Sequence, residues 1–251
     1  MVKRDSLVKF KYYVRSYFYE ISCCDLCGQQ VGITELNNQH LEQALVCQYC
    51  LDGLTYFKQN SIVTNLLNWP AVHRSLPNIL FDTLFAISPY VYPFDLWLSQ
   101  LKYSGRFELA KLLATILAAQ WKTSHHEQSL STVDLVISIP LHVKKWRERG
   151  FNQSHLIGQC FAKKLSLNYD ANVVKKIKHT TSQMGKTGPQ RRKHLKDSFV
   201  LQKKLAKNIR HVVIVDDVVT TGTTASEVSR LFKNAGVETV SVVAVCLVIP
   251  H

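Results

Sequence analysis

The chain has 251 residues, of which 46% are hydrophobic and 20% are charged, with only 10 glycines and 7 prolines. This composition is typical of a globular protein, excludes a low-complexity chain, and leaves room for one large domain or for a small domain beside a medium-sized one. The net charge of +13 and the isoelectric point near 9.4 favour anionic partners, namely nucleic acid, phosphorylated substrates or an anionic membrane surface, although charge can also serve solubility alone.

The first 22 residues mix basic side chains with aromatic and other apolar ones. No long uninterrupted apolar run follows these charges or occurs elsewhere, so we expect neither a secretory signal nor a membrane-spanning helix. We therefore expect a cytoplasmic protein. The pattern itself fits an amphipathic helix that packs on the next domain or touches a membrane surface.

Five of the seven cysteines lie within the first 50 residues. Cys24-x-x-Cys27 and Cys47-x-x-Cys50 are separated by 19 residues, close to the spacing of a structural zinc ribbon. Two such turns place four thiolates about 2.3 Å from one ion and leave no open position for catalysis. Disulfides or a redox motif explain the pattern less well, because no signal peptide is expected and the motif occurs twice. Cys23 is an alternative to Cys24, but its spacing to Cys27 is one residue too long.

The middle of the chain changes character. Residues 56–99 contain the proline-punctuated sequence WPAVHRSLP, and we expect a helical connector without catalytic chemistry. The stretch Leu101–Trp121 then predicts a helix with one leucine-rich buried face. It opens with Lys102-Tyr103-x-Gly105.

The segment Leu135–Ile139 predicts a short buried strand, and the sequence after it predicts a basic loop. We expect Gly150, at the end of this loop, to open an amphipathic helix. In an open parallel sheet such loops gather at the carboxyl ends of the strands, where their positive charge can meet an anionic ligand. A solvated basic loop is the alternative. The basic residues are Lys144, Lys145, Arg147 and Arg149.

Residues 178–199, KHTTSQMGKTGPQRRKHLKDSF, are polar, basic and interrupted by glycine and proline. A loop of this length inside a compact domain is typical either of disorder or of a functional lid. In a lid, Arg191 and Arg192 could clamp phosphate oxygens. A partner-binding surface is the alternative use of the same charges.

The most informative stretch is RHVVIVDDVVTTGTT, residues 210–224. Val212–Val215 predicts a parallel strand buried on both faces, which we expect to end before Asp216 and Asp217. A turn then leads into a helical pattern over Ala225–Asn234. The unpartnered N–H groups of such a turn and helix end suit a phosphate, whereas the carboxylates suit the hydroxyls of a sugar or the waters of Mg²⁺. An ordinary N-capped helix is the alternative. The turn consists of Thr220, Thr221, Gly222, Thr223 and Thr224.

The sequence VVIVDDVVTTGTT resembles the 5-phosphoribosyl-1-pyrophosphate (PRPP) motif of the type I phosphoribosyltransferases. The resemblance implies that Asp216 and Asp217 face the ribose hydroxyls and that residues 220–224 hold the 5′-phosphate, with Mg²⁺ accompanying PRPP. In an active transferase the two acids would steady the charged sugar. The four basic residues of the earlier loop would face the pyrophosphate, with Lys144 and Lys145 binding PRPP and Arg147 and Arg149 acting on the departing group.

Three stretches together, PLHVKKWRERGFNQS, TTSQMGKTGPQRRKHLKDSF and VVIVDDVVTTGTT, resemble the ComF family of competence proteins when read behind the CxxC/CxxC head. The resemblance covers most of the chain. It implies a PRPP- and Mg²⁺-binding, phosphoribosyltransferase-like protein that handles incoming single-stranded DNA in the cytoplasm during natural transformation, with the DNA-uptake machinery as a partner. The transferase half is also similar to that of amidophosphoribosyltransferase, but we do not expect glutamine-dependent amination, because a basic segment and the CxxC pairs stand where that enzyme has its glutaminase domain.

We therefore predict an α/β protein with a type I phosphoribosyltransferase-like parallel sheet and an N-terminal zinc ribbon. Two alternative functions stay open: an active transferase of nucleotide metabolism with an unknown acceptor, and a nucleic-acid adaptor whose ribbon binds DNA. The predicted parts are a basic segment and four-cysteine zinc ribbon over 1–55, the connector over 56–99, and the transferase-like domain over 100–251, with strands at Leu135–Ile139, Val212–Val215 and Val240–Val248.

Overall fold

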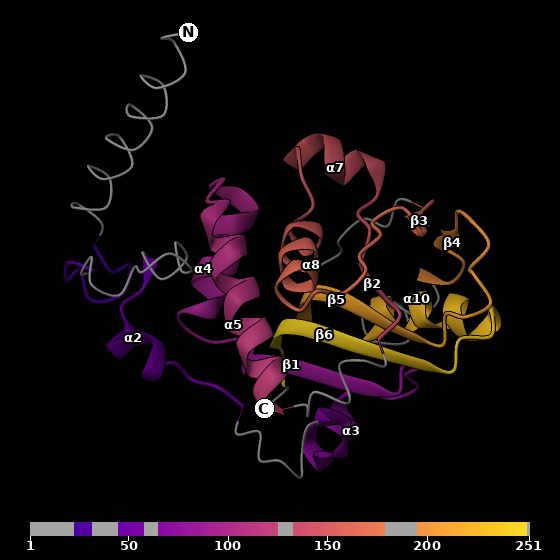
Figure 1. The fold of residues 1–251 in the computed structure, drawn as a ribbon, viewed down its shortest axis with the longest axis horizontal. Helices are drawn as coiled ribbons and strands as arrows, with labels where there is room; N and C mark the ends of the chain where they lie inside the picture. The colour runs from indigo at the N-terminus through magenta and orange to yellow at the C-terminus, as the bar shows by residue number, and fades with distance from the viewer. Residues whose placement is uncertain (1–22, 32–44, 58–64, 125–132, 179–194, 250–251) are drawn as a thin grey trace, which may run out of the picture. The chain divides into compact units, whose positions relative to one another are not determined.

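A computed structural model shows the chain as two compact units, residues 1–54 and 55–251. No helix in the part that the structure describes is long and apolar enough to cross a membrane. The described residues are 23–31, 45–57, 65–124, 133–178 and 195–249 (Figure 1).

The described part of the smaller unit is a tight turn and a short helix. In the turn, the N–H of Gly28 donates to the carbonyl of Cys24 at 2.9 Å, and Gly28 has a φ of +71°, which only glycine adopts readily. The N–H of Asp25 donates to the carbonyl of Leu45 at 2.9 Å, which ties the turn to the segment before helix α2, Gln48–Asp52. The two CxxC pairs are thus held together by backbone hydrogen bonds.

The larger unit is built on a four-stranded parallel sheet with the strand order β1-β6-β5-β2 (Figure 1). Three strands lie where the apolar runs predicted them, and β1 is an edge strand that the sequence analysis did not predict. Its residues fall within the stretch expected to be a connector. The strands are β1, Thr83–Pro89; β2, Leu135–Ser138; β5, His211–Val219; and β6, Thr239–Leu247.

Strand β5 continues past Val215, where we expected it to end. On one side its pairing with β2 stops at the Ser138–Val215 pair, but on the other side its pairing with β6 runs on to the Val219–Leu247 pair. Asp216 and Asp217 therefore lie on extended backbone of β5 that is paired with β6 on one side and extends beyond the end of β2 on the other. The prediction was wrong because it read the end of the apolar run as the end of the strand.

Helices cover both faces of the sheet (Figure 1). On one face, Gly158 of α8 lies so close to the sheet that an added Cβ would be 3.3 Å from the Cβ of Val215. On the other face, Val212 and Ile214 belong to one buried core with Val228 of α10. The helices of the first face are α4, Phe94–Tyr103; α5, Glu108–Ser124; and α8, Gln153–Lys164, and α10 on the second face is Thr223–Asn234.

The helix predicted over Leu101–Trp121 is two helices. Helix α4 ends at Tyr103, and Gly105 follows with a φ of +67°, a left-handed conformation that interrupts the helical path before α5 begins at Glu108. The break leaves Lys102 in the last turn of α4. Its side chain is consequently available to the carboxyl edge of the sheet.

The basic loop predicted after β2 is largely a helix, α7, Val143–Arg149. Gly150 does not open the next helix but ends α7, with a φ of +80° and its N–H donating to the carbonyl of Trp146 at 2.7 Å. No residue of α7 is buried, and the helix stands away from the sheet at the top of Figure 1. Exposed basic side chains explain why the sequence looked like a loop.

Helix α10 begins two residues before its predicted start and ends as predicted. The N–H of Gly236, at a φ of +90°, donates to the carbonyl of Lys233, and the N–H of Val237 donates to that of Phe232, both at 3.0 Å. These two bonds are those of a Schellman motif. The remaining elements are the 3₁₀ helix η3, Leu66–Asn68; α3, Pro70–Ser75; and an antiparallel pair, β3, Val174–Lys176, with β4, Phe199–Leu201.

The predicted lid falls between β3 and β4. Most of it, including Arg191 and Arg192, lies outside the described residues.

Candidate functional site

Asp216 and Asp217, called the acid pair below, lie at the carboxyl end of the sheet. The N–H of Asp217 donates to Oδ1 of Asp216 at 2.9 Å, and Ser154 Oγ lies 3.0 Å from the same oxygen. Asp217 is buried, with 6% of its surface exposed, whereas Asp216 is half-buried. The two acids therefore differ in their access to a ligand.

Asp217 is held by three side chains from two helices. Lys102 of α4 forms an ion pair with its Oδ2, and the exposed fractions of the two side chains are only 19% and 8%. Gln153 Nε2 donates to Oδ1 at 3.3 Å, and Ser154 Oγ lies 3.3 Å from the same atom. Asp217 is thus fixed in place by the protein itself.

The pKa values of the two acids move in opposite directions. Burial and the neighbouring charge of Asp217 hold the pKa of Asp216 well above its usual range. Burial acts in the same direction on Asp217, but the Lys102 ammonium outweighs it and lowers the pKa of Asp217. The same ion pair outweighs the burial of Lys102 and raises the pKa of Lys102. Asp217 is consequently the charged member of the acid pair.

The RGFNQS sequence explains how α8 reaches the acid pair. Asn152 caps α8 by accepting from the N–H of Ser154 at 3.1 Å, and its amide donates to the carbonyl of Ile139, directly after β2, at 2.9 Å. Phe151 packs edge-on against Phe107, with ring centroids 4.8 Å apart. These contacts fix the start of α8 at the sheet edge, so that the next residue, Gln153, contacts Asp217.

Arg149 connects α7 to the same network. Its Nη1 donates to Oε1 of Gln153 at 2.6 Å, while its guanidinium lies 5.3 Å from the ring centroid of Tyr103. Gln153 thus bridges a guanidinium and the Asp217 carboxylate. Arg149 and the acid pair, predicted separately from two motifs, are brought together by the structure.

A further cation, Lys176 of β3, belongs to this region and was not predicted from the sequence. Its Nζ lies 5.2 Å from the ring centroid of Phe199. Burial and the charge of Lys145 lower the pKa of Lys176 to about 8, and Asp216 opposes this shift. Lys145 of α7, Lys176 of β3 and Asp216 of β5 are therefore electrostatic neighbours.

The predicted phosphate turn joins β5 to α10. Gly222 has a φ of +65°, and an added Cβ would be 3.3 Å from Ile79 and 3.4 Å from Leu76, so both the conformation and the space require glycine. The hydroxyls of Thr221 and Thr223 are 2.9 Å apart. The N–H groups of the first turn of α10 have no acceptor within the helix and are donors for an anion.

A cavity of about 420 Å³ opens beside this turn. Thr221 and Thr223 line one end of it, and Ser226, Glu227 and Arg230 continue along the same side of α10. Arg230 is already paired with Glu227 at 2.8 Å and with Asp197 at 2.9 Å. The acid pair does not line this cavity, which therefore extends the threonine turn away from the acids.

Four other predicted residues take no part in the contacts described above. Lys144 and Arg147 are exposed on α7, and their side chains make no hydrogen bond or ion pair with another described residue. Thr220 is exposed and Thr224 is half-buried. The residues that sequence analysis missed are Lys102, Gln153, Ser154 and Lys176; Gln153 and Ser154 lay within the RGFNQS motif and Lys102 within KYSG, but neither motif showed a contact.

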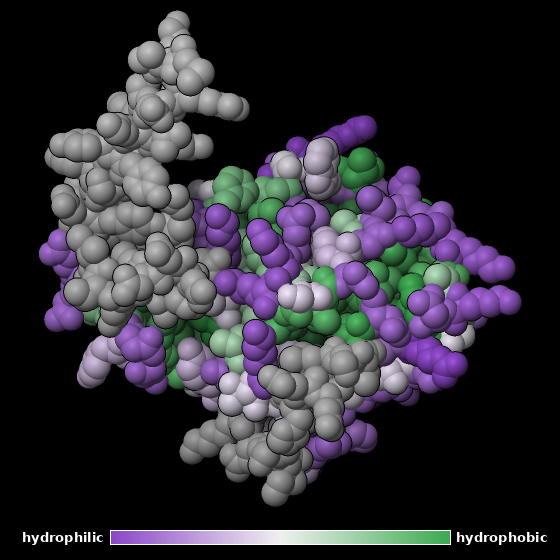
Figure 2. Space-filling model, in the orientation of Figure 1, coloured by the Kyte–Doolittle hydropathy of each residue, from purple (hydrophilic) through white to green (hydrophobic). Residues whose placement is uncertain are grey.

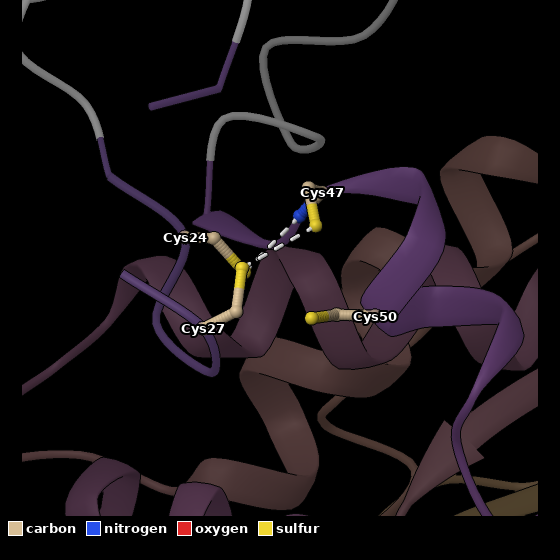
Figure 3. Close-up of side chains that lie close together, drawn as sticks. All are labelled: Cys24, Cys27, Cys47 and Cys50. Carbon is tan, nitrogen blue, oxygen red and sulfur yellow. Dashed lines mark hydrogen bonds between the residues drawn. The ribbon is translucent and has the colours of Figure 1, made fainter. Parts of the chain in front are cut away.

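In the smaller unit, four cysteines converge, and they are called the cysteine cluster below. Their Sγ atoms all lie within 4.8 Å of one another, and Figure 3 shows the side chains pointing toward a common centre. Of the two adjacent cysteines at the start of the first turn, Cys24 lies in the cluster and Cys23 is exposed. The cluster consists of Cys24, Cys27, Cys47 and Cys50.

The geometry of the cysteine cluster fits a tetrahedral ion. The Sγ atoms of Cys27 and Cys47 are 3.8 Å apart, which matches the separation of about 3.8 Å expected for two sulfurs that each lie ~2.3 Å from zinc. Burial opposes the ionisation of Cys24, but backbone N–H groups, that of Cys47 foremost, outweigh it and lower the pKa of Cys24 to about 6. Burial and the other thiols raise the pKa of Cys50 to about 12. Four thiols this close need a cation to become thiolates together.

Comparisons with known proteins agree with this fold. Residues 157–249, which include most of α8, together with β5, the phosphate turn and β6, match the family model described as "Phosphoribosyl transferase domain". A hypoxanthine phosphoribosyltransferase from Staphylococcus aureus aligns over 70% of this chain and 71% of its own at 16% identity, but the TM-score of 0.33 is too low to carry an argument. The larger unit is thus a phosphoribosyltransferase-like α/β domain.

Similarity to whole proteins is more specific. Competence protein F of Haemophilus influenzae is 30% identical over 82% of this chain and 91% of its own length. The DNA utilization protein YhgH of Salmonella typhimurium is 35% identical over 80% of this chain and 89% of its own length, and that of Escherichia coli K12 is 33% identical over 70% and 80%. The chain belongs to the ComF family, as the motifs predicted.

Proposed function

We propose that this protein binds PRPP together with Mg²⁺ and handles incoming single-stranded DNA in the cytoplasm during natural transformation. One observation carries the PRPP assignment: a half-buried acid adjoins an anion-binding turn at the carboxyl edge of a parallel sheet, with Lys102, Arg149 and Lys176 around it. Acids suit the ribose diol, the turn suits the 5′-phosphate, and the cations suit the pyrophosphate. Mg²⁺ enters with the pyrophosphate, whose charge it neutralises.

Calorimetric titration with PRPP and Mg²⁺ tests this assignment. We expect Asp216→Asn to lower the affinity for PRPP by about tenfold or more, because the amide lacks the second oxygen that the acid offers to the two sugar hydroxyls. Glu238→Gln makes the same acid-to-amide change at the amino end of β6, in an exposed ion pair with Arg210, and is the matched control. Equal affinities for the two variants would refute the assignment of the site.

We also propose that the cysteine cluster binds one structural Zn²⁺. The four converging thiols and their separations support this assignment, and four protein ligands leave no position for substrate. The ion would stabilise the fold of the smaller unit, which we retain as a zinc ribbon within residues 1–55. Residues 100–251 would then form the transferase-like part of the chain together with β1, so that only the remainder of 56–99 would serve as the connector.

Helix α7 supports the assignment of single-stranded DNA. It has no buried residue, carries four basic residues against one acid, and exposes 52% of Trp146. Hydrophilic side chains extend along it at the top of Figure 2. Cations that follow a phosphate backbone and an aromatic ring that stacks on bases are what sequence-tolerant binding of single strands requires. The names of the relatives, competence protein F and DNA utilization protein, point the same way.

Fluorescence anisotropy with a labelled oligothymidylate tests the role of α7. We expect Trp146→Ala to weaken binding by about tenfold through lost stacking, and Lys144→Glu with Arg147→Glu to flatten the dependence on salt. Lys111→Glu with Lys122→Glu, at two exposed positions of α5, is the charge-matched control. The DNA-uptake machinery is the proposed partner, since an incoming strand must be passed on from it. Wild-type affinity in all three α7 substitutions would remove α7 from the DNA site, whereas binding by residues 1–55 would favour the adaptor function.

An active phosphoribosyltransferase is the second candidate function. The contact of Arg149 with Gln153, which itself donates to Asp217, favours it, because a guanidinium linked to the acid pair would stabilise the charge of departing pyrophosphate. The test is release of pyrophosphate from PRPP in the presence of a panel of bases and amines. Release of pyrophosphate with one acceptor would establish a transferase. No release with any acceptor, together with retained binding of PRPP, would favour a binding role.

A further inference from the structure

The acid pair carries its own counter-ion, and the counter-ion contacts only one acid. Lys102 pairs with Asp217, while Asp216 forms no ion pair within the described part of the chain. Gln153 and Ser154 occupy the other oxygen of Asp217. Both oxygens of Asp217 are therefore engaged by protein groups before any ligand arrives.

Lys102 reaches this place because of two local features. Helix α4 buries Phe94, Trp97, Leu98 and Leu101 in the core, which fixes its axis, and the break at Gly105 ends the helix just beyond Lys102. The Lys102 side chain is largely shielded from water, with 19% of its surface exposed. An amine held this firmly beside a carboxylate is part of the site rather than a solvated surface charge.

The position of Lys102 is also where a divalent cation would otherwise be attracted. Two adjacent carboxylates form a site that hard cations such as Mg²⁺ and Mn²⁺ prefer. An ammonium group that already neutralises one of them removes much of this attraction. At the same time it lowers the repulsion that two charged acids would exert on the phosphates of an approaching ligand.

We propose that Lys102 is a positioning residue of the sugar-phosphate site: it neutralises Asp217, so that Asp216 is the acid that meets the ribose hydroxyls, and it takes the place of a metal ion beside the acid pair. This inference rests on the proposed function for the identity of the sugar phosphate. The role of Lys102 toward the acids does not depend on that identity. Ligand recognition would then be divided, with Asp217 setting the geometry and Asp216 making the contact.

Mn²⁺ binding, followed by electron paramagnetic resonance on the zinc-loaded full chain, tests the first part without PRPP. We expect Lys102→Met to bind Mn²⁺ about tenfold or more tightly than the wild type, because two unneutralised carboxylates then face each other. Lys102→Arg keeps the charge and should match the wild type. Lys111→Met, at an exposed position of α5, is the matched control. Equal Mn²⁺ affinity in Lys102→Met and the wild type would overturn the proposal.

A double variant controls for the possibility that Lys102→Met does not fold. Lys102→Met combined with Asp217→Asn replaces both members of the ion pair by neutral groups of similar size, which a buried site tolerates better than one unpaired charge. It should fold and should lose the gain in Mn²⁺ affinity. Retention of the gain would show that the metal binds elsewhere and would overturn the proposal.

PRPP titrations with and without Mg²⁺ test the second part. In Lys102→Met, we expect the affinity without Mg²⁺ to fall by about tenfold and to recover in part when Mg²⁺ is added, so that binding depends more steeply on the metal. An unchanged Mg²⁺ dependence would overturn this part. If the wild type binds no PRPP, the proposed function fails, yet the Mn²⁺ measurement still decides the role of Lys102.

Discussion

The cysteine cluster and the acid pair differ in how the repulsion between their negative charges is compensated. Each collects groups that repel one another when deprotonated. The cysteine cluster brings four thiols within 4.8 Å, and no lysine or arginine pairs with them in the described part of the smaller unit. The acid pair, in contrast, holds Lys102 against Asp217. The cysteine cluster would therefore depend on the proposed Zn²⁺ for its charge balance, whereas the acid pair is balanced by a lysine of the protein itself.

This difference follows from what each unit can bury. The described part of the smaller unit contributes few buried apolar side chains, such as Val31 and Val46, so a metal ion is the stronger source of stability. The larger unit encloses its sheet between helices and can support a buried ion pair without a metal. We expect loss of zinc to unfold the smaller unit and to leave the larger one intact.

The largest effect is expected from Cys47→Ser. Structural zinc contributes about 10–16 kcal/mol to small metal-dependent folds, and three thiolates hold it far less well than four. The variant should lose bound zinc and become sensitive to protease within residues 1–54, while residues 55–251 stay resistant. Zinc content by atomic absorption and limited proteolysis measure these outcomes. Cys23→Ser, outside the cluster, should behave as the wild type, and zinc retained in Cys47→Ser would contradict the comparison.

Asp217→Asn should cost the larger unit about 3 kcal/mol of unfolding free energy, because Lys102 is then buried without its counter-ion. Asp217 has a lowered pKa in the folded protein, so its contribution to stability is present above the pKa of an unfolded aspartate, ~4, and is lost as the pH falls through the folded value. Urea unfolding between pH 3 and pH 7 measures both effects. A variant as stable as the wild type at pH 7 would show that the ion pair contributes nothing.

Asp216→Asn should change the unfolding free energy in the opposite direction and by a smaller amount. The raised pKa of Asp216 means that the folded protein loses stability as the pH rises from ~4 toward the raised value, since the unfolded aspartate ionises in this range while the folded one, beside Asp217, keeps its proton. An amide cannot ionise, so the variant should be more stable than the wild type at pH 7 and should lose this part of the pH dependence. The same urea titrations measure it. A gain in stability together with lost PRPP affinity would mark Asp216 as the ligand-facing acid.

The comparison also shows which parts of the fold could be predicted from the sequence. Strands β2, β5 and β6 are buried on both faces, and their valine and isoleucine runs are visible without any partner. Strand β1 was missed because it lies in a proline-punctuated stretch and gains its role by pairing with β6. The hydroxyl of Thr83 donates to that of Ser241 at 2.7 Å across 158 residues of sequence, and no local pattern reports such a contact.

The two candidate sites differ in the same way. The cysteine cluster is built from two local turns, so the CxxC spacing was enough to predict its four members. The acid pair and its threonine turn were also visible as a motif, but the residues that tune them come from other elements. Lys102 from α4 and Lys176 from β3 meet β5 only through the packing of the domain. Charge compensation is thus the part of this site that sequence patterns could not show.

Substitution of Lys176 is expected to have the smallest effect on PRPP affinity. It tests whether a second lysine besides Lys102 contributes to the charge compensation of the site. Its pKa of about 8, lowered by burial and by Lys145, means that it loses its proton as the pH rises from 7 to 9. PRPP affinity should therefore fall a few-fold over this range, where the phosphates themselves are already ionised. In Lys176→Met the affinity should be lower at pH 7 and flat up to pH 9. Lys175→Met, the exposed neighbour on β3, should keep the pH dependence, and an identical slope in Lys176→Met would place the titrating group elsewhere.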